Sequence, residues 1–267
     1  MSKSPLGVLI LHGFTASLDC VSGIDEGVAP LGIPTRMPVL RGHEAGSPEA
    51  LRGVRWSDWV ADAESALQEL RGEAEQVVIV GHSMGTLVAT MLAADHAEEA
   101  FVDSVVLAAP ALQLASPLAP GNRFSFMIPA MKWVLRKWDM PPNYADESLA
   151  QYDTNYPWAP MDAVMEILQF SAIARRRLPE LKLPALIIQS RNDTTVAPES
   201  AQIVCDELAT PPEHKRIQWF ERTEHEMFRD CERDEVIEAV VDFIRERLAA
   251  VSNASRFGKS AAREEGR

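Results

Sequence analysis

The sequence predicts an α/β fold in which a mostly parallel sheet carries helices on both faces. Short apolar runs rich in Val, Ile and Leu recur along the chain, with stretches of helical periodicity between them, which is typical of parallel sheets. One run, residues 77–80, leads through a glycine-flanked serine into an Ala-rich helical stretch. The 267 residues suffice for one such core with an inserted subdomain.

The first part of the chain supplies four predicted strands. Residues 6–11 form a buried strand, and residues 34–40 form a more exposed one that runs into a turn-rich loop. Residues 77–80 form the third strand, and residues 104–110 form the fourth, which stops at a proline.

An amphipathic helix is predicted between the second and third strands, with Ser57 as its N-cap. Its outer face carries acidic residues that we expect to be solvated. The apolar positions recur at i, i+3, i+4, i+7, i+11 and i+14; they are Trp56, Trp59, Val60, Ala63, Leu67 and Leu70.

The last part of the chain completes a sheet of six strands, or slightly more. Residues 183–190 and 215–220 supply the fifth and sixth strands, and a final helix follows them. We expect residues 1–110 and 182–255 to form the core. Residues 256–267 are polar and mixed in charge, which predicts a disordered tail.

Residues 111–181 differ in composition and are predicted to form a helical cap insertion over the C-terminal edge of the sheet. Prolines, methionines and aromatic residues gather in this stretch, and no strand pattern is recognisable. An insertion of this size cannot enclose so many large side chains alone, so we expect some of them to line a substrate cavity. The candidates are Met127, Met131, Trp158 and Met165.

Charge and cysteine content limit the class of partner. A net charge of −13 at pH 7 disfavours nucleic acid and anionic membranes. It favours a neutral, partly apolar small molecule. Three cysteines cannot all pair within the chain, and no apolar stretch approaches the roughly 18 residues of a membrane helix. We therefore expect a cytoplasmic protein without stable membrane insertion; no oligomeric state follows.

Gly81, Ser83 and Gly85 form a G-x-S-x-G pattern at the junction of a strand and a helix. Such a sharp reversal brings the two elements so close that side chains two residues before and after the serine would collide. The turn would expose the Ser83 hydroxyl at a helix N-terminus, where free amides favour negative charge. This context predicts a nucleophile elbow.

A serine nucleophile needs a base and an acid that orients the base. In an open α/β sheet both should follow the carboxyl ends of strands. Asp193 follows the fifth strand and His225 the sixth, so we select them as acid and base. The alternative for Asp193 is a turn or cap residue before Pro198.

The other histidines fit less well. His82 should point away from the serine hydroxyl because of the sharp turn, His96 ends a surface helix and His214 precedes its strand. We expect His12 and His43 to brace loops. For the oxyanion, the expected donors are the backbone N–H groups of Met84 and of Phe14, beside Gly13.

These motifs resemble the α/β-hydrolase superfamily over about residues 5–250. The motifs are His12-Gly13-Phe14, Gly81-His82-Ser83-Met84-Gly85, Asp193 and His225. The Arg41-Gly42-His43 loop and the insertion after Pro110 resemble those of bacterial carboxylesterases and monoacylglycerol lipases. Thr86 departs from the further glycine that many of these enzymes have. A serine nucleophile also differs from the carboxylate of related dehalogenases and epoxide hydrolases.

The resemblance implies a serine hydrolase that cleaves neutral esters, with short-to-medium acyl chains or as monoacylglycerols, through an acyl-enzyme on Ser83. No metal or organic cofactor is implied. The same triad could instead act on a thioester, an amide or a C–C bond, or as a perhydrolase. A non-catalytic small-molecule receptor and a scaffold that binds proteins through its Met- and Trp-rich insertion are further alternatives.

Overall fold

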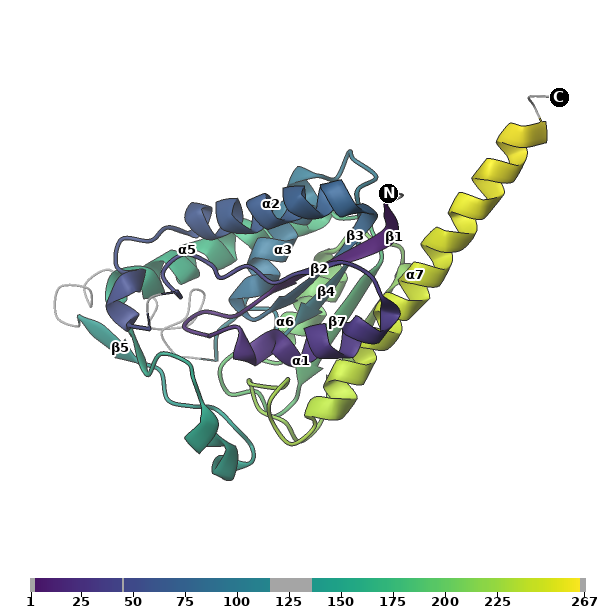
Figure 1. Cartoon of the computed structure of the whole chain (residues 1–267). Coiled ribbons are helices and arrows are strands. Elements are labelled where there is room, and N and C mark those ends of the chain that lie inside the picture. The colour runs from purple at the N-terminus through teal and green to yellow at the C-terminus, as the bar shows by residue number, and fades with distance from the viewer. Residues whose placement is uncertain (1–2, 45, 116–135, 265–267) are drawn as a thin grey trace.

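The computed structural model describes residues 3–44, 46–115 and 136–264, and places one central sheet between two layers of helices (Figure 1). The strand order is β2-β1-β3-β4-β7-β8. All neighbouring strands in it are parallel. The predicted six-stranded sheet is therefore confirmed.

Five of the six strands lie close to their predicted positions, whereas one is much shorter. β2 has only two residues in place of the predicted residues 34–40, because Pro38 lacks the N–H needed to continue the ladder. The bounds are β1 Ser4–Leu11, β2 Thr35–Arg36, β3 Ala74–His82, β4 Val102–Ala108, β7 Ala185–Ser190 and β8 Lys215–Phe220.

The apolar runs bury both faces of the sheet, because alternate side chains of a strand point in opposite directions. In β3, Val77 and Ile79 belong to one hydrophobic core, and Val78 and Val80 belong to the other. α2, α3, α5 and α6 cover the first face, while α1 and α7 cover the second. The α-helices are α1 Asp19–Val28, α2 Trp56–Glu73, α3 Met84–Asp95, α5 Met161–Arg177, α6 Glu199–Glu207 and α7 Arg233–Glu264.

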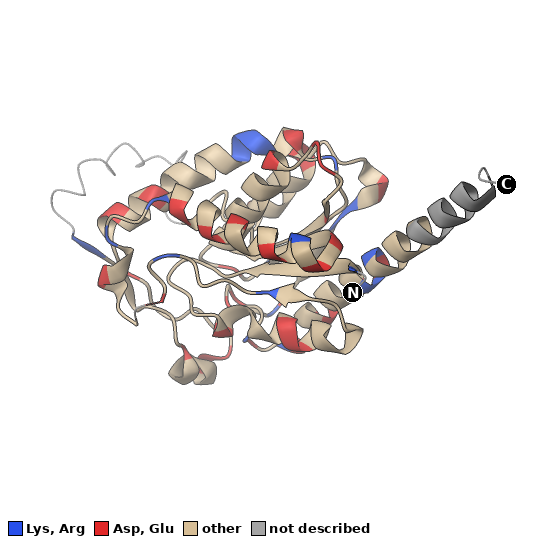
Figure 2. Cartoon of the chain, turned by 45° about the horizontal axis from the view of Figure 1, so that its top comes forward, with Lys and Arg blue, Asp and Glu red and all other residues tan. Residues whose placement is uncertain are grey.

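Helix α2 begins one residue earlier than its predicted cap. Arg55, not Ser57, is the N-cap residue, because Trp56 is already helical. The Asp58 carboxylate accepts a hydrogen bond from the Arg55 N–H at 2.9 Å. Acidic residues are spread over the helices and loops of the molecule (Figure 2), in line with its net charge of −13.

The segment between β4 and β7 is not entirely helical, so that part of the prediction is wrong. β5 (Lys137–Asp139) and β6 (Trp158–Pro160) form an antiparallel pair before α5. Prolines disfavour a helix here, because Pro141, Pro142 and Pro157 lack the N–H that a helix interior requires. α5 is part of the main core and not of a separate cap, since Ile167, Phe170 and Ala174 belong to the hydrophobic cluster that covers one face of the sheet.

Helix α7 continues to Glu264, where the sequence predicts a disordered tail from residue 256. The composition of residues 256–264 includes alanine, arginine and glutamate, which have good helix propensity. The helix leaves the body of the molecule in its second half (Figure 1). Across the described residues, none of the helices combines the length and apolar character needed to cross a membrane.

Candidate active site

Ser83 lies in a strained turn between β3 and α3. Its backbone angles are φ 52° and ψ −117°, a conformation that L residues rarely adopt. A Cβ atom on Gly81 would lie 2.4 Å from the Gly85 carbonyl oxygen, and one on Gly85 would lie 2.2 Å from the Leu11 carbonyl oxygen. Both glycines are therefore required by close backbone packing, as the predicted elbow needs.

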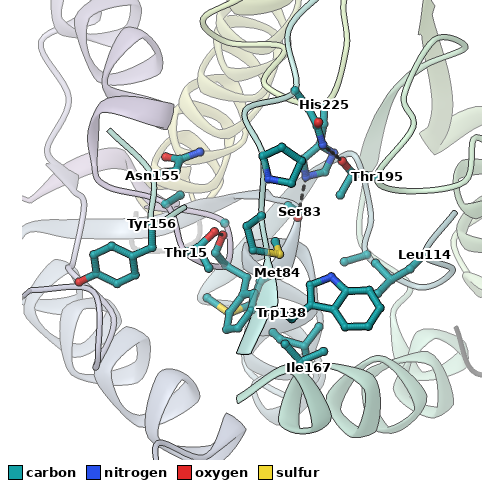
Figure 3. A pocket seen from close by; sticks show the side chains of 18 of the residues that line it. Thr15, Ser83, Met84, Leu114, Trp138, Asn155, Tyr156, Ile167, Thr195 and His225 are labelled. Carbon is teal, nitrogen blue, oxygen red and sulfur yellow. Dashed lines mark hydrogen bonds between the residues drawn. The ribbon is translucent and has the colours of Figure 1, made fainter. Parts of the chain in front are cut away.

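The loops after β7 and β8 bring the predicted acid and base to this turn. The Nε2 atom of His225 lies 3.0 Å from the Oγ of Ser83 (Figure 3). Its Nδ1 lies 3.0 Å from an Asp193 carboxylate oxygen. All three residues are buried. The arrangement can pass a proton from a serine hydroxyl to a ring whose tautomer is fixed by a carboxylate.

The acid and the base stabilise each other's charged forms. Burial opposes a charge on His225, but the Asp193 carboxylate outweighs it and raises the pKa of His225 to about 9. Burial likewise opposes ionisation of Asp193, whereas His225 and two backbone N–H groups lower its pKa. Those N–H groups belong to Thr195 and Val196, at 2.9 and 2.8 Å from Oδ1.

Gln189, which the sequence analysis did not select, also holds the acid. Its Nε2 donates to the Asp193 Oδ2 at 3.0 Å. Gln189 is fully buried in strand β7, where a polar side chain is unusual. A buried glutamine four residues before the candidate acid was the only sequence signal for this contact.

The backbone amides expected to hold an oxyanion come from two elements beside Ser83. Met84 is the first residue of α3, so its N–H has no carbonyl one helical turn back. Among the described residues, the Phe14 N–H has no hydrogen-bond acceptor. Phe14, Met84 and Ser83 line the same cavity. A Cβ on Gly13 would approach the Ser83 Cβ to 3.3 Å, so the first loop passes close to the elbow.

His12 and His43 lie where the sequence places them, bracing loops. The Nε2 of His12 accepts a hydrogen bond from the Leu40 N–H at 3.0 Å. The Nε2 of His43 accepts one from the Thr15 N–H at 3.1 Å, and Thr15 has a positive φ of 60°. Burial, and secondarily His43, lowers the pKa of His12 to about 3. Both rings therefore act as neutral acceptors.

His82 makes no hydrogen bond with the Ser83 hydroxyl in the described part of the chain, and its ring supports the base. Its Nε2 lies 3.0 Å from the backbone carbonyl oxygen of His225. Burial lowers the pKa of His82 to about 3, and the nearby His225 adds to this effect. A neutral ring with a proton on Nε2 can donate to that carbonyl and so hold the His225 backbone.

A cavity of about 450 Å³ opens above Ser83. Its apolar wall comes mainly from one stripe of α5 and from Leu114 and Trp138 (Figure 3). Polar side chains, including Thr15, Asn155 and Thr195, also line the cavity, and Thr195 lies beside His225. The α5 stripe contains Met161, Val164, Ile167 and Leu168.

Two of the four residues predicted to line the cavity do not line it, so the prediction for them is wrong. Met127 and Met131 lie outside the described residues. Met165 lies beside the cavity-lining stripe of α5, and Trp158 does not line the cavity either. Trp158 packs instead under the Lys137 ammonium, 3.7 Å from the ring centre. Trp138, on the partner strand β5, lines the cavity in the position predicted for Trp158.

No cluster of three or more His, Cys, Asp or Glu side chains suited to a metal ion occurs in the described part of the chain. The described acidic and histidine side chains at the elbow are engaged with each other and with backbone groups. The Ser83, His225 and Asp193 side chains can supply nucleophilic attack and proton transfer.

Comparison with known proteins gives consistent matches over most of the chain. Residues 4–232 match the family described as serine aminopeptidase, S33. A thermostable monoacylglycerol lipase from Bacillus sp. (strain H-257) is 24% identical over 241 residues, covering 90% of this chain and 91% of the lipase. A carboxylesterase from Bacillus subtilis (strain 168) is 23% identical over 240 residues, covering 89% and 91%.

A solved structure from work on LipS and LipT, two metagenome-derived lipolytic enzymes, superposes with a TM-score of 0.80. It is 27% identical and covers 91% of this chain and 95% of its own. The predicted fold class is therefore confirmed.

Proposed function

The chain belongs to the family described as serine aminopeptidase, S33, within the α/β-hydrolases, and we propose that it is a serine hydrolase that cleaves neutral carboxylic esters. Ser83 is the nucleophile, His225 the base and Asp193 the acid that orients the base. The single observation that carries the proposal is the continuous contact from Ser83 through His225 to Asp193, with two separations of 3.0 Å, at the floor of a largely apolar cavity.

In the acylation step, the Ser83 oxygen attacks the ester carbonyl carbon while the Nε2 of His225 takes the hydroxyl proton. The carbonyl oxygen becomes an oxyanion, which the backbone N–H groups of Phe14 and Met84 stabilise. Loss of one such donor typically costs about 3–4 kcal/mol of transition-state stabilisation. Collapse breaks the ester C–O bond, and the alcohol leaves with the proton from His225.

In the deacylation step, a water molecule repeats the sequence on the acyl-enzyme. His225 takes a proton from the water, the resulting hydroxide attacks the acyl carbon, and Ser83 leaves with the proton. Asp193 stabilises the positively charged ring in both steps. Close backbone packing at Gly81 and Gly85 holds Ser83 in its strained conformation throughout.

The cavity supports a neutral substrate with an apolar acyl part. Its volume of about 450 Å³ lies within the range of small-molecule sites, and its wall along α5 carries no ionised side chain among the lining residues. Two relatives are named as a monoacylglycerol lipase and a carboxylesterase. We therefore propose short-to-medium acyl esters or monoacylglycerols as the substrate class.

Cleavage of an amide is the second candidate, because the family description is that of an aminopeptidase. The same three residues would attack an amide carbonyl, with His225 protonating a leaving amine. A panel of p-nitrophenyl esters, thioesters and amino-acid p-nitroanilides separates the two reactions. The ester proposal expects the esters to have the highest kcat/KM.

The test of the nucleophile is intact-protein mass spectrometry after exposure to a fluorophosphonate, with Ser83→Ala in parallel. Attack on phosphorus forms one Oγ–P bond and releases fluoride. We expect a single adduct on the wild type, none on the variant, and loss of p-nitrophenyl ester hydrolysis in the variant. A variant that keeps its activity, or a wild type that forms no adduct, would overturn the proposal.

A further inference from the structure

Residues 137–160, which we call the cap arm, lie against all three loops that carry the proposed catalytic groups. The Tyr156 N–H donates to the Thr15 carbonyl oxygen, next to Phe14, at 2.8 Å. The Asn143 side chain donates to the Thr195 hydroxyl, in the Asp193 loop, at 2.5 Å. The third connection goes to residues 221–232, the base loop, which contains His225.

Asp230 makes this third connection. It is 1% exposed, and its carboxylate accepts hydrogen bonds from both the cap arm and the base loop. Oδ2 accepts from the Ala145 N–H at 2.8 Å and the Glu224 N–H at 2.7 Å. Oδ1 accepts from the Asp146 N–H at 3.1 Å and the Cys231 N–H at 2.8 Å. Each oxygen therefore bridges the two segments.

The connection continues from Glu224 to the base and the acid. The Glu224 carboxylate accepts a hydrogen bond from the His225 N–H at 2.5 Å and from the Thr194 N–H at 2.8 Å. Thr194 is next to Asp193 in the chain. A shift of Asp230 would therefore move the Glu224 backbone, and with it the carboxylate that fixes both His225 and the Asp193 loop.

We propose that Asp230 is a positioning residue, which couples the seating of the cap arm to the placement of His225 against Ser83. This inference rests on the proposed function only in that His225 is the base. Asp230 itself lies outside the cavity lining.

The acceptor pattern explains why a carboxylate is needed at this position. The Thr223 hydroxyl, at 3.2 Å, adds a fifth donor to the four backbone N–H groups. Burial opposes ionisation of Asp230, but these backbone donors lower its pKa, so the group is charged at neutral pH. An asparagine would place its NH₂ group against at least two N–H donors and leave them without an acceptor.

Glu232 provides a matched control on the same loop. Its carboxylate is also buried and accepts two backbone hydrogen bonds, from Arg222 at 2.9 Å and Thr223 at 2.7 Å. Among the described residues, it has no hydrogen bond to the cap arm. Glu232→Gln therefore removes a buried negative charge from the same loop without breaking the connection to the arm.

The structural half of the test is hydrogen–deuterium exchange, read by mass spectrometry on peptides covering residues 140–150 and 221–232. In Asp230→Asn we expect faster exchange in both peptides. In Glu232→Gln we expect faster exchange in the base loop alone. This measurement does not depend on activity, so it remains informative even if the proposed function fails.

The functional half is the rate of fluorophosphonate labelling across pH 6–10. We expect Asp230→Asn to lower the plateau labelling rate by about 10- to 100-fold, because displacing a catalytic group by about 1 Å can lower the rate by about 100-fold. The midpoint of the pH profile should also fall toward 6.5, because a displaced His225 loses part of its contact with Asp193. Glu232→Gln should leave the midpoint in place.

Two results would overturn the coupling. One is exchange in residues 140–150 that is unchanged in Asp230→Asn; the other is equal loss of labelling in both variants. If Asp230→Asn does not fold, Ala145→Pro tests the same connection from an exposed position of the cap arm, since proline removes one donor N–H. A normal rate and midpoint in Ala145→Pro would then contradict the proposal.

Discussion

A Cβ atom on Gly85 would lie 2.2 Å from the carbonyl oxygen of Leu11, so the first turn of α3 rests directly on the end of β1. Leu11 is followed within three residues by Phe14, and Gly85 is preceded by Met84. This backbone contact therefore fixes the distance between the two segments that carry the proposed oxyanion donors. No side chain larger than hydrogen fits between them.

Gly85→Ala should accordingly lose both stability and labelling. Overpacking of this kind typically costs about 1–3 kcal/mol of unfolding free energy, and any relief must move Met84 away from the first loop. Gly72→Ala is the matched control, because Gly72 lies in α2, where an added methyl group would meet nothing within 4 Å. The unfolding free energy of this variant should rise by up to about 1 kcal/mol. Urea denaturation and fluorophosphonate labelling of both variants check this. Full labelling of Gly85→Ala would contradict it.

Asp193→Asn should lower the activity by about four orders of magnitude, as seen when the acid of such a triad is neutralised. The pH dependence should change with it. His225 must be neutral to accept a proton, and its pKa is raised to about 9, so wild-type kcat/KM should rise with pH between about 7 and 9. Without the carboxylate, the midpoint should move to lower pH. A profile that keeps its midpoint would show that Asp193 does not set this pKa.

Stability should fall in acid because His12, His43 and His82 are buried in neutral form. The pKa values of His12 and His82 are lowered to about 3 by burial. Between pH 3 and 6.5 the unfolded chain therefore binds protons that the folded chain does not. The unfolding free energy then decreases as pH falls below about 6.5, by up to about 1.4 kcal/mol per pH unit for each such histidine.

His225 acts in the opposite direction, because its raised pKa stabilises the folded state below 6.5 and this contribution is lost as pH rises through about 9. His12→Gln isolates one contribution. Its amide oxygen can still accept from the Leu40 N–H, so we expect only a small loss of stability at pH 7 but a shallower decline between pH 6.5 and 4.5. Chemical denaturation at four pH values measures both. An unchanged slope would exclude His12 as a source of the acid sensitivity.

The sequence located the candidate triad because each member follows a strand that can be recognised locally. The apolar runs before Ser83, Asp193 and His225 all end at the same edge of a parallel sheet, so their proximity followed from topology alone. The steric need for Gly81 and Gly85 followed from the turn itself. These features depend on a few neighbouring residues.

Features that depend on pairing between distant segments were not predictable in this way. β5 and β6 are only three residues each, and they pair across a loop of eighteen residues, 140–157. Which of Trp138 and Trp158 faces the cavity depends on that pairing. Asp230 looked like an ordinary acidic residue, because its five donors come from the base loop and from residues 145 and 146.

Trp138 and Trp158 therefore offer a direct test of the acyl site, since they lie on neighbouring strands and only Trp138 lines the cavity. In a β-hairpin, Trp138 and its partner Ala159 share one face, while Trp158 lies on the other.

Trp138→Ala removes part of the apolar wall that faces the acyl chain, so longer chains should lose the most contact. Each buried methylene contributes about 0.8 kcal/mol. The preference for p-nitrophenyl hexanoate over acetate, measured as the ratio of kcat/KM, should fall by about 10-fold or more in Trp138→Ala, because at least two methylenes lose that contact. It should stay unchanged in Trp158→Ala. Equal ratios in the two variants would mean that the acyl chain lies elsewhere, and the polar lining residues Asn155 and Thr195 would then be the next to vary.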